Sequence, residues 1–564
     1  MSASGRVLGT VPAVGVRWCA VLLAGVVALA GCERKTETSE TPEATTQAVE
    51  QTKVGVLPEG APQPNIIIIL VDALRADRLA AYGNSGKLSP TMDAFAASGM
   101  VFDRCVSAAP WTLPSVATLF TSYYPGVHKA TSYRVVAGME DGKQAYQSVL
   151  SDDFDTFAEV LHANGYQTAG FVAAKFLRKE YGFGQGFEHY DTSFADNTVR
   201  GELVNQAFLT WFDEQRDESR PLFTYLHYMD VHGPYDAAPQ FMDPLMKQVE
   251  DNPNKQLLSP REFRAINAYL RKPPAQTSDP ERFERLKGYR EYWEARYNAG
   301  VREMDFHLMQ LFKQLKERGL WENSLIILTA DHGEALCEHG LWDHGYSLYQ
   351  TDLHVPLVMR WPGVVPAGKR VRRLASLIDV MPTLLEQLRL PPGTGLQGQS
   401  LVAHMSGTLP STPQVRLAEA IKSGPRQFAL FTDVTKLMVT YFPARALPDG
   451  SQSKGTTRTQ LFNLGTDPGE QFNVADQNPD VAKQMGKLMG GVIQRNMQTK
   501  PELVVQRQAI DEATRRQLES VGYIGGAEEE DDEPNDPVEE TPATSQPAAP
   551  AADADEQQPA KPGP

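Results

Sequence analysis

Two short runs of apolar residues, each followed by an aspartate, give the first indication of the fold. Residues 65–71 (NIIIILV) are continuously apolar after Asn65 and rich in β-branched side chains, and Asp72 follows them. Residues 324–330 (SLIILTA) repeat this pattern, and Asp331 follows. A short apolar run of this kind is typical of a central parallel strand that is covered on both faces. The pattern therefore predicts two buried strands with Asp72 and Asp331 at their carboxyl ends.

Helical patterns alternate with short strand patterns between these two runs. This alternation predicts an α/β fold, a doubly wound and mostly parallel sheet flanked by helices. Ligands bind such sheets beyond the carboxyl ends of the strands, where both aspartates are expected. Residues 240–290 are polar, and we interpret them as an insertion over the sheet edge that shapes substrate access. The predicted helices cover residues 154–164, 203–216 and 297–318, and the predicted strands cover residues 168–173 and 222–228.

The residue pattern changes past Leu390, where loops rich in proline and glycine separate strand-like pieces at residues 427–439 and 459–463. This pattern predicts a smaller C-terminal subdomain with an antiparallel sheet. The polar segments at both ends lack apolar periodicity and are expected to be disordered. The predicted segments are therefore a signal peptide at 1–31, a disordered tether at 32–60, a catalytic domain at 61–390, the C-terminal subdomain at 391–526 and an acidic disordered tail at 527–564.

The first residues have the character of an export signal. Arg6 and Arg17 precede the apolar run 18–30, which is too short to span a bilayer. Residues 29–32 (LAGC) resemble the lipobox of bacterial lipoproteins, which implies cleavage before Cys32 and lipidation of its thiol. We favour this interpretation over an uncleaved anchor because a polar linker follows. The prediction is an exported protein, lipid-anchored to a bacterial membrane and facing the periplasm or the exterior.

Charge and cysteine content exclude two further classes of protein. The formal net charge is −16, and twelve acidic residues and one lysine of residues 527–564 account for most of it. The chain thus lacks the broad basic surface that nucleic-acid binding requires, and no nucleic-acid partner is expected. Four cysteines are too few for a disulfide framework. Once Cys32 is acylated and the signal removed, Cys105 and Cys337 permit at most one intrachain disulfide.

Several polar groups near the predicted strand ends could carry chemistry. Thr112 precedes the apolar helical run 116–123, so it is expected at a helix N-terminus, where N–H groups and the dipole favour an anion. Asp331 and His332 supply an oxygen and an imidazole ligand for a divalent ion. Taken singly, residues such as Asp72 and Thr112 are more often helix caps than functional groups.

A further candidate segment, residues 227–235 (HYMDVHGPY), contains two histidines. In a continuous strand His227 and His232 would point to opposite faces, so at most one of them is expected to be catalytic. The other is expected to be a hydrogen-bonded core histidine.

In their order and context these segments resemble the sulfatase family within the alkaline phosphatase-like superfamily. The resemblance rests on residues 65–83, 111–125 and 329–345, with further support from residues 354–363, 376–384 and 461–470. It implies the α/β fold of that superfamily and one divalent metal ion (Ca, Mn, Mg or Zn) held by Asp72, Thr112, Asp331 and His332.

By the same resemblance, Thr112 is also the nucleophile and His232 contacts the substrate oxyanion. His344 falls where many sulfatases have a lysine, which makes it a candidate general acid, because imidazole suits proton transfer near neutral pH. Arg75 is a further candidate. The implied substrate is a small-molecule, glycan or lipid ester.

The chain also departs from the family pattern. Sulfatases carry Cys or Ser in Cys-x-Pro-Ser-Arg, matured to formylglycine, whereas this chain has Thr112 and, in place of the arginine, Val116. Oxidation of threonine would give a ketone, so no formylglycine is expected. Ala73 replaces a second aspartate, and whether Lys175 replaces the lysine of the usual Gly-Lys-Trp-His segment stays open.

Two hypotheses follow from these matches and departures. The first is a metal-dependent hydrolase of sulfate, phosphate or phosphonate esters that uses Thr112 as its nucleophile and favours phosphoesters. The second is a noncatalytic binding protein with the sulfatase fold. Retention of all four metal positions and His344 favours the enzyme.

Overall fold

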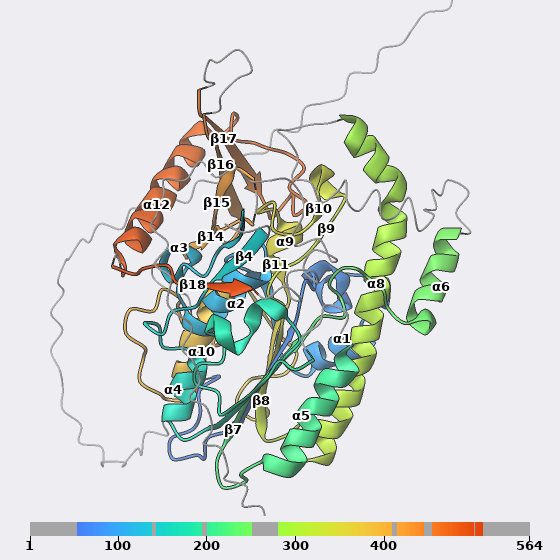
Figure 1. The fold of residues 1–564 in the computed structure, drawn as a ribbon, viewed down its shortest axis with the longest axis vertical. Coiled ribbons are helices and arrows are strands. Elements are labelled where there is room, and N and C mark those ends of the chain that lie inside the picture. Colours follow the sequence, from blue (N-terminus) through green and yellow to red (C-terminus); the bar gives the residue numbers. More distant parts are fainter. Residues whose placement is uncertain are drawn as a thin grey trace, which may run out of the picture. The chain divides into compact units, whose positions relative to one another are not determined.

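A mixed β-sheet with parallel central strands organises the part of the chain that the structure describes (Figure 1). The protein is represented by a computed structural model. The predicted signal peptide, Cys32, most of the tether and the acidic tail lie outside the described residues. These are residues 54–137, 143–194, 200–250, 280–408, 414–422, 424–444, 454–500 and 502–510.

Within the described residues the central sheet has nine strands, in the order β11-β2-β12-β8-β1-β7-β5-β6, with β13 paired to β2. The pairs β1–β7, β1–β8, β5–β7 and β5–β6 are parallel, whereas β12 runs antiparallel to β8 and β2. The strands are β1 (Asn65–Val71), β2 (Met100–Val106), β5 (Gln167–Val172), β6 (His189–Asp191), β7 (Leu222–Tyr228), β8 (Ser324–Thr329), β11 (His354–Val355), β12 (Leu357–Arg360) and β13 (Lys369–Ser376).

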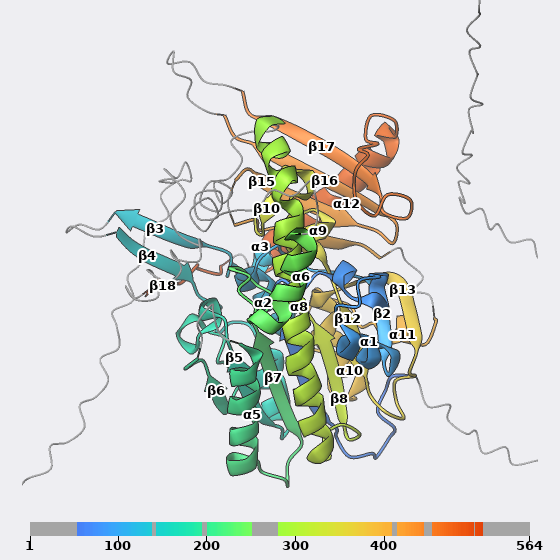
Figure 2. The same cartoon turned by 90° about the vertical axis from the view of Figure 1, so that its right-hand side faces the viewer.

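Helices cover both faces of this sheet, as the apolar composition of its central strands requires. In Figure 1, α1, α5 and α8 lie on one side of the strands, and α2, α4 and α10 lie on the other; Figure 2 looks onto the side that carries α5 and α8. The described helices are α1 (Pro90–Ala97), α2 (Thr112–Thr121), α3 (Pro125–His128), α4 (Phe157–Ala163), α5 (Gly201–Gln215), α6 (Pro239–Glu250), α8 (Pro280–Glu317), α9 (Gln350–Leu353), α10 (Val380–Gln387), α11 (Val402–Met405) and α12 (Pro479–Gln498). Single 3-10 turns are η1 (Ala76–Arg78), η2 (Ala80–Tyr82), η3 (Lys175–Leu177), η4 (Lys179–Tyr181), η5 (Glu338–Gly340) and η6 (Leu377–Asp379).

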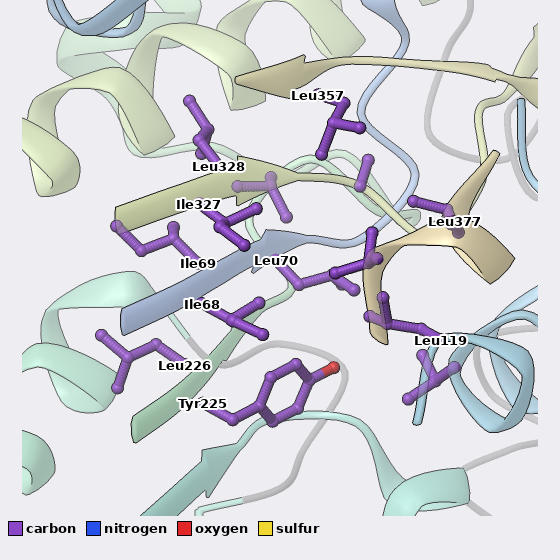
Figure 3. Close-up of a cluster of buried hydrophobic side chains, with 14 of the residues drawn as sticks. Ile68, Ile69, Leu70, Leu119, Tyr225, Leu226, Ile327, Leu328, Leu357 and Leu377 are labelled. Atoms are coloured by element: carbon purple, nitrogen blue, oxygen red, sulfur yellow. The ribbon is translucent and has the colours of Figure 1, made fainter. Parts of the chain in front are cut away.

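The hydrophobic core lies where β1, β7 and β8 are adjacent. Figure 3 shows buried apolar side chains of these strands, Ile68 and Leu70 of β1, Leu226 of β7 and Ile327 and Leu328 of β8. Each of these side chains is fully buried. Burial of one such side chain contributes about 1.5–3 kcal/mol, so these strands form a rigid base for whatever follows their carboxyl ends.

The structure confirms the predicted α/β fold, with some differences in the elements. The strands expected at residues 65–71 and 222–228 form there, and the helix expected at 297–318 begins earlier, at Pro280. Residues 427–439 are two strands joined by a turn rather than one strand. Of the expected insertion, α6 and the first part of α8 are described, whereas residues 251–279 lie outside the described residues. No helix in the described part of the chain combines the length and apolarity that a membrane span requires.

The predicted C-terminal antiparallel sheet is also present. It contains β14 (Arg416–Ala418), β15 (Arg426–Phe431), β16 (Thr435–Phe442) and β17 (Thr456–Asn463), and α12 packs on it through Met485 and Met489. Two small sheets complete the described strands: β9 (Ala335–Leu336) with β10 (Trp342–Asp343), and β3 (Tyr133–Ala137) with β4 (Lys143–Ser148) and β18 (Arg507–Ile510).

A buried ion pair ties this C-terminal sheet to the loop before α9. Lys436 of β16 contacts the Glu470 carboxylate and the Leu348 carbonyl, and the Gln350 N–H donates to Glu470 Oε2 (2.6 Å). Both charged side chains are fully buried. The pair thereby fixes the segment around Leu348 and Gln350, where the chain enters α9.

Removing one partner of this pair should destabilise the protein strongly. Lys436→Met leaves the Glu470 carboxylate buried without its cation, and the expected loss in the free energy of unfolding is about 3–5 kcal/mol. Lys436→Met combined with Glu470→Gln should recover most of that loss. Denaturant unfolding measures both, with Lys313→Met in the exposed Lys313–Glu317 pair as the control that should change little. Equal stability of Lys436→Met and wild type would contradict the expectation.

Candidate active site

Asp72 and Asp331 lie side by side because the strands that carry them are neighbours. β1 and β8 are parallel and in register, with Leu70 opposite Thr329, so their carboxyl ends meet at one edge of the sheet. Both carboxylates are fully buried. Asp331 Oδ1 accepts the N–H groups of Ala73 (3.2 Å) and His332 (2.9 Å), which leaves Oδ2 to face Asp72 and its neighbours. Backbone hydrogen bonds therefore set the orientation of this carboxylate.

Thr112 reaches the two aspartates from the first position of α2. Its hydroxyl donates to Asp72 Oδ2 (3.2 Å) and lies 3.3 Å from His332 Nε2. Trp111, not Thr112, occupies the cap position of α2, and the structure shows no side-chain capping bond there. Ser115, one turn further, donates to the Asp331 carbonyl (2.7 Å) and so fixes α2 to the β8 loop. The hydroxyl of Thr112 is thus positioned among ionisable groups and is not used as a helix cap.

His332 points one ring nitrogen at the carboxylates. Its Nδ1–H donates to the Gly333 carbonyl (2.8 Å), whereas Nε2 lies 3.3 Å from Asp72 Oδ1 and 3.4 Å from Asp331 Oδ2. Although burial opposes it, the carboxylates of Asp331 and Asp72 raise the pKa of His332 to about 10. The cluster therefore attracts positive charge at this point.

The two carboxylates have the properties of metal ligands. Within the described residues, Asp72 Oδ1 and Asp331 Oδ2 have no hydrogen bond of good geometry. Burial and the neighbouring Asp72 carboxylate raise the pKa of Asp331, as expected for two like charges in one buried site. A divalent cation would relieve this repulsion and take the place of the proton on His332, since metal ligation requires neutral imidazole. The donor set fits such an ion.

His227 is a member of this cluster that the sequence analysis did not assign. The expectation that one of the two histidines is a hydrogen-bonded core residue was wrong for His227, because neither of its ring nitrogens has a hydrogen-bond partner among the described residues. Its Nε2 lies 3.7 Å from Asp72 Oδ2. The premise of one continuous strand also failed, because β7 ends at Tyr228 and His232 follows in a loop. The sequence shows His227 only as a histidine one residue before the end of a strand, and the pairing of that strand with β1 is what the sequence did not show.

His344 and His232 lie beside His332. The ring centre of His344 is 4.3 Å from that of His332 and 4.9 Å from that of His232. Nδ1 of His344 lies 3.2 Å from Glu334 Oε1 and 3.1 Å from Asp343 Oδ1. The Nδ1–H of His232 donates to the Gly233 carbonyl (2.8 Å). Both imidazoles are therefore oriented through Nδ1, and His344 lies directly beside His332.

The electrostatics of the Glu334–His344 pair follow from its burial. Burial and the nearby Asp343 raise the pKa of Glu334 to about 8. Burial, with the neighbouring His332, lowers the pKa of His344 well below its usual range. Their contact therefore joins a carboxyl group that keeps its proton at neutral pH to a neutral imidazole.

Arg75 is the sequence candidate whose contacts lie elsewhere. Its guanidinium donates to both carboxylate oxygens of Asp77 (2.9 and 2.7 Å), to Glu338 (3.0 Å) and to the Glu334 carbonyl (2.8 Å). These bonds hold the η1 turn against the loop after β8. The structure thus gives Arg75 a role in shaping the site and shows no contact between it and the metal-type ligands. Cys105 and Cys337 are buried free thiols.

A threonine hydroxyl at the start of a helix, beside convergent carboxylates and imidazoles at the edge of a mostly parallel sheet, is an arrangement that suits a metal-dependent ester hydrolase. The family model described as Sulfatase matches residues 64–390. The chain belongs to the sulfatase family.

Individual relatives are distant. The chain is 23% identical over 413 residues to N-acetylglucosamine-6-O-sulfatase of Bacteroides thetaiotaomicron, a match that covers 61% of this chain and 71% of the relative. A solved structure of another protein, in complex with that protein's substrate D-glucosamine-2-N,6-O-disulfate, has a TM-score of 0.60 at 20% identity. The match covers 78% of this chain and 99% of that protein's chain. The phosphonate monoester hydrolase of Agrobacterium radiobacter has a TM-score of 0.57 at 20% identity, over 77% of this chain and 96% of its own. The two structures support the fold, and both sulfate and phosphonate ester hydrolases share it.

Proposed function

We propose that this sulfatase-family hydrolase cleaves phosphate or phosphonate esters in preference to sulfate esters, through a covalent intermediate on Thr112. The observation that carries the proposal is the Thr112 hydroxyl itself, which lies within 3.3 Å of both Asp72 and His332 at the start of α2. Threonine cannot become formylglycine, so its hydroxyl must attack directly. The family and this arrangement favour hydrolysis over the noncatalytic binding protein that the sequence left open.

The residues at the site can perform a two-step displacement. Asp72, Thr112, Asp331 and His332 would hold a divalent ion, which supplies Lewis-acid polarisation of the ester and lowers the pKa of the hydroxyl. Thr112 Oγ1 attacks phosphorus as its own proton is released to solvent. The bond from phosphorus to the leaving oxygen breaks as the Nε2–H of His344 gives its proton to that oxygen, while His344 Nδ1 takes the proton of the Glu334 carboxyl group. Water then attacks the Thr112 phosphoester, and His344 accepts a proton from that water at Nε2 and returns its Nδ1 proton to Glu334. The Thr112 oxygen takes a proton from solvent as it leaves.

The substrate class we propose is an ester of a sugar or a lipid headgroup. A relative acts on an N-acetylglucosamine sulfate ester, and one solved neighbour binds a glucosamine disulfate. The phosphonate monoester hydrolase supports the same fold as a scaffold for phosphorus chemistry.

A panel of four aryl esters tests the proposal directly. Aryl sulfate, aryl phosphate monoester, aryl phosphodiester and aryl phosphonate monoester are each assayed with Ca, Mn, Mg and Zn. Turnover of phosphorus esters that exceeds turnover of the sulfate supports the proposal. Turnover of the sulfate alone would overturn the phosphoester preference and leave the hydrolase assignment intact.

His344→Gln should lower kcat in a way that depends on the leaving group. For an ester of a weakly acidic alcohol, loss of a general acid is expected to cost about 10²–10⁴-fold. For a p-nitrophenyl ester the loss should be far smaller, because nitrophenolate leaves without a proton. His232→Gln is the control, since loss of an oxyanion contact should slow both esters to a similar extent. Equal losses for both esters in His344→Gln would remove His344 as the general acid.

We also propose that the chain is exported and lipid-anchored through Cys32. The support is the sequence of residues 1–32, with its basic start, its apolar run and its Leu-Ala-Gly-Cys end. Cys32→Ala should abolish acylation, as measured by mass spectrometry of the N-terminal peptide, and move the protein out of the membrane fraction. A wild-type protein with an unmodified Cys32 would contradict the anchor.

A further inference from the structure

We infer that His227 is a ligand of the metal centre and that the resulting pair of imidazoles makes the centre select a zinc-like transition metal over calcium and magnesium. The inference rests on the metal centre of the proposed function and does not depend on Thr112 being the nucleophile.

The fold places His227 at the centre by strand pairing. β7 lies next to β1 in parallel register, with His227 opposite Leu70, two residues before Asp72. The side chain is fully buried, and Nε2 lies 3.7 Å from Asp72 Oδ2. A nitrogen of His227 and carboxylate oxygens of Asp72 and Asp331 all lie within 4.8 Å of one another. His227 therefore reaches the same point as the two aspartates from a third strand.

Three of the polar side chains at this point present atoms that the described protein does not satisfy. These are Asp72 Oδ1, Asp331 Oδ2 and both ring nitrogens of His227. Buried polar atoms without a hydrogen bond destabilise a protein, so they are rare unless something binds them. Their convergence in one fully buried place indicates a common ligand, and a cation is the ligand that satisfies carboxylates and an imidazole together.

His128 is a buried histidine outside the site, and its hydrogen bonds provide a comparison for His227. It is buried on α3, its Nε2 lies 3.1 Å from Thr118 Oγ1, and its Nδ1 accepts the Ala130 N–H (3.1 Å). Both of its ring nitrogens are thus used within the protein. His227 differs from His128 in the feature that a metal ligand requires, a ring nitrogen directed at carboxylates without a hydrogen bond of its own.

The donor set that includes His227 changes the expected metal. Asp72, Asp331 and Thr112 supply oxygens, and His332 adds one imidazole whose Nε2 is directed inward by the bond from Nδ1 to Gly333. With His227 the centre has two imidazoles. Calcium and magnesium prefer oxygen ligands throughout, whereas imidazole suits zinc and its neighbours in the transition series. The position after Asp72, Ala73, offers no carboxylate that would restore an oxygen-rich set.

Metal competition and a count of imidazole ligands test the inference. Full-length protein stripped of metal is equilibrated with equal concentrations of Ca, Mg, Mn and Zn, and bound metal is measured by elemental analysis. Zinc should occupy the centre, with calcium and magnesium each below about one-tenth of its content. X-ray absorption at the zinc edge should show two imidazoles in wild type and one in His227→Gln, with zinc affinity reduced by at least about 10-fold.

His404→Gln is the matched control. His404 is also buried with neither ring nitrogen hydrogen-bonded within the described residues, but it lies on α11 away from the two aspartates, so its loss should leave zinc affinity and the imidazole count unchanged. One imidazole in the wild-type spectrum overturns the inference, and this measurement needs no variant to fold. Equal occupancy by calcium and zinc also overturns it.

The same measurements separate this inference from the proposed function. Thr112→Ala protein that turns over substrate but binds zinc through two imidazoles would defeat the nucleophile and leave the role of His227 standing. Wild-type zinc with one imidazole, together with loss of turnover in Thr112→Ala, would defeat the role of His227 and leave the nucleophile standing.

Discussion

Thr112→Ala should abolish turnover while the protein stays folded. The hydroxyl is the group that attacks the ester, and removal of a catalytic nucleophile costs about 10⁴-fold or more in kcat. Thr112 is buried, and its hydroxyl bonds to the Asp72 carboxylate, so the free energy of unfolding should fall by about 1–3 kcal/mol. Steady-state kinetics and thermal unfolding measure the two effects separately.

Two variants make this result specific to the nucleophile. Thr112→Ser keeps a hydroxyl and should retain activity within about 100-fold of wild type. Thr121→Ala removes a buried threonine from the same helix whose hydroxyl donates to the Ala117 carbonyl (2.7 Å), and it should leave kcat unchanged. Wild-type kcat in Thr112→Ala would remove Thr112 from the mechanism.

Asp331→Asn should empty the metal centre. Asp331 Oδ1 accepts two backbone N–H groups, from Ala73 and His332, so the amide oxygen of asparagine must take that place. The amide NH₂ then points at Asp72 and His332, where a cation needs an oxygen. The affinity for the metal should fall by more than about 100-fold, which elemental analysis detects as a loss of bound metal. Turnover should be lost with the metal.

Asp305→Asn controls for the loss of a buried carboxylate. Asp305 accepts the N–H groups of Thr91 (2.9 Å) and Met92 (2.8 Å) at the start of α1, away from the site. An asparagine oxygen can accept the same bonds, so metal content should stay at the wild-type level. Unchanged metal content in Asp331→Asn itself would show that the ion, if one is bound, lies elsewhere.

The parts of the fold that follow from local apolar patterns could be predicted from the sequence. The β1 and β8 runs are apolar enough to require burial on both faces, and an aspartate directly after each strand has to lie at the carboxyl edge. The start of α2 at Thr112 followed equally from the apolar run after it. These features depend on neighbours in sequence, which is why Asp72 and Asp331 could be expected at one edge of the sheet and Thr112 at the start of a helix. That the three residues and His332 lie together was implied by the resemblance to the sulfatase family.

The contacts that could not be predicted depend on neighbours in space. His227 has the same sequence context as any histidine in a buried strand, and only the pairing of β7 with β1 brings its ring to Asp72. The contact between Glu334 and His344 joins two ends of a turn-rich loop, which has no periodic pattern from which the contact could be predicted. Lys436 and Glu470 likewise sit in segments with no motif in common, although together they fix the chain before α9.

The protein itself positions the four proposed metal ligands, and this affects whether the chain folds before or after it binds the ion. Backbone groups orient Asp331 and His332, and strand pairing places Asp72 and His227, so none of these placements requires an ion. We therefore expect folding to precede metal uptake and the ion to add stability by mass action, about 2.7 kcal/mol at a free concentration 100 times Kd. A chain exported as we propose would fold first and take its ion from the supply outside the cytoplasm, so its activity would follow the metal content of the surroundings.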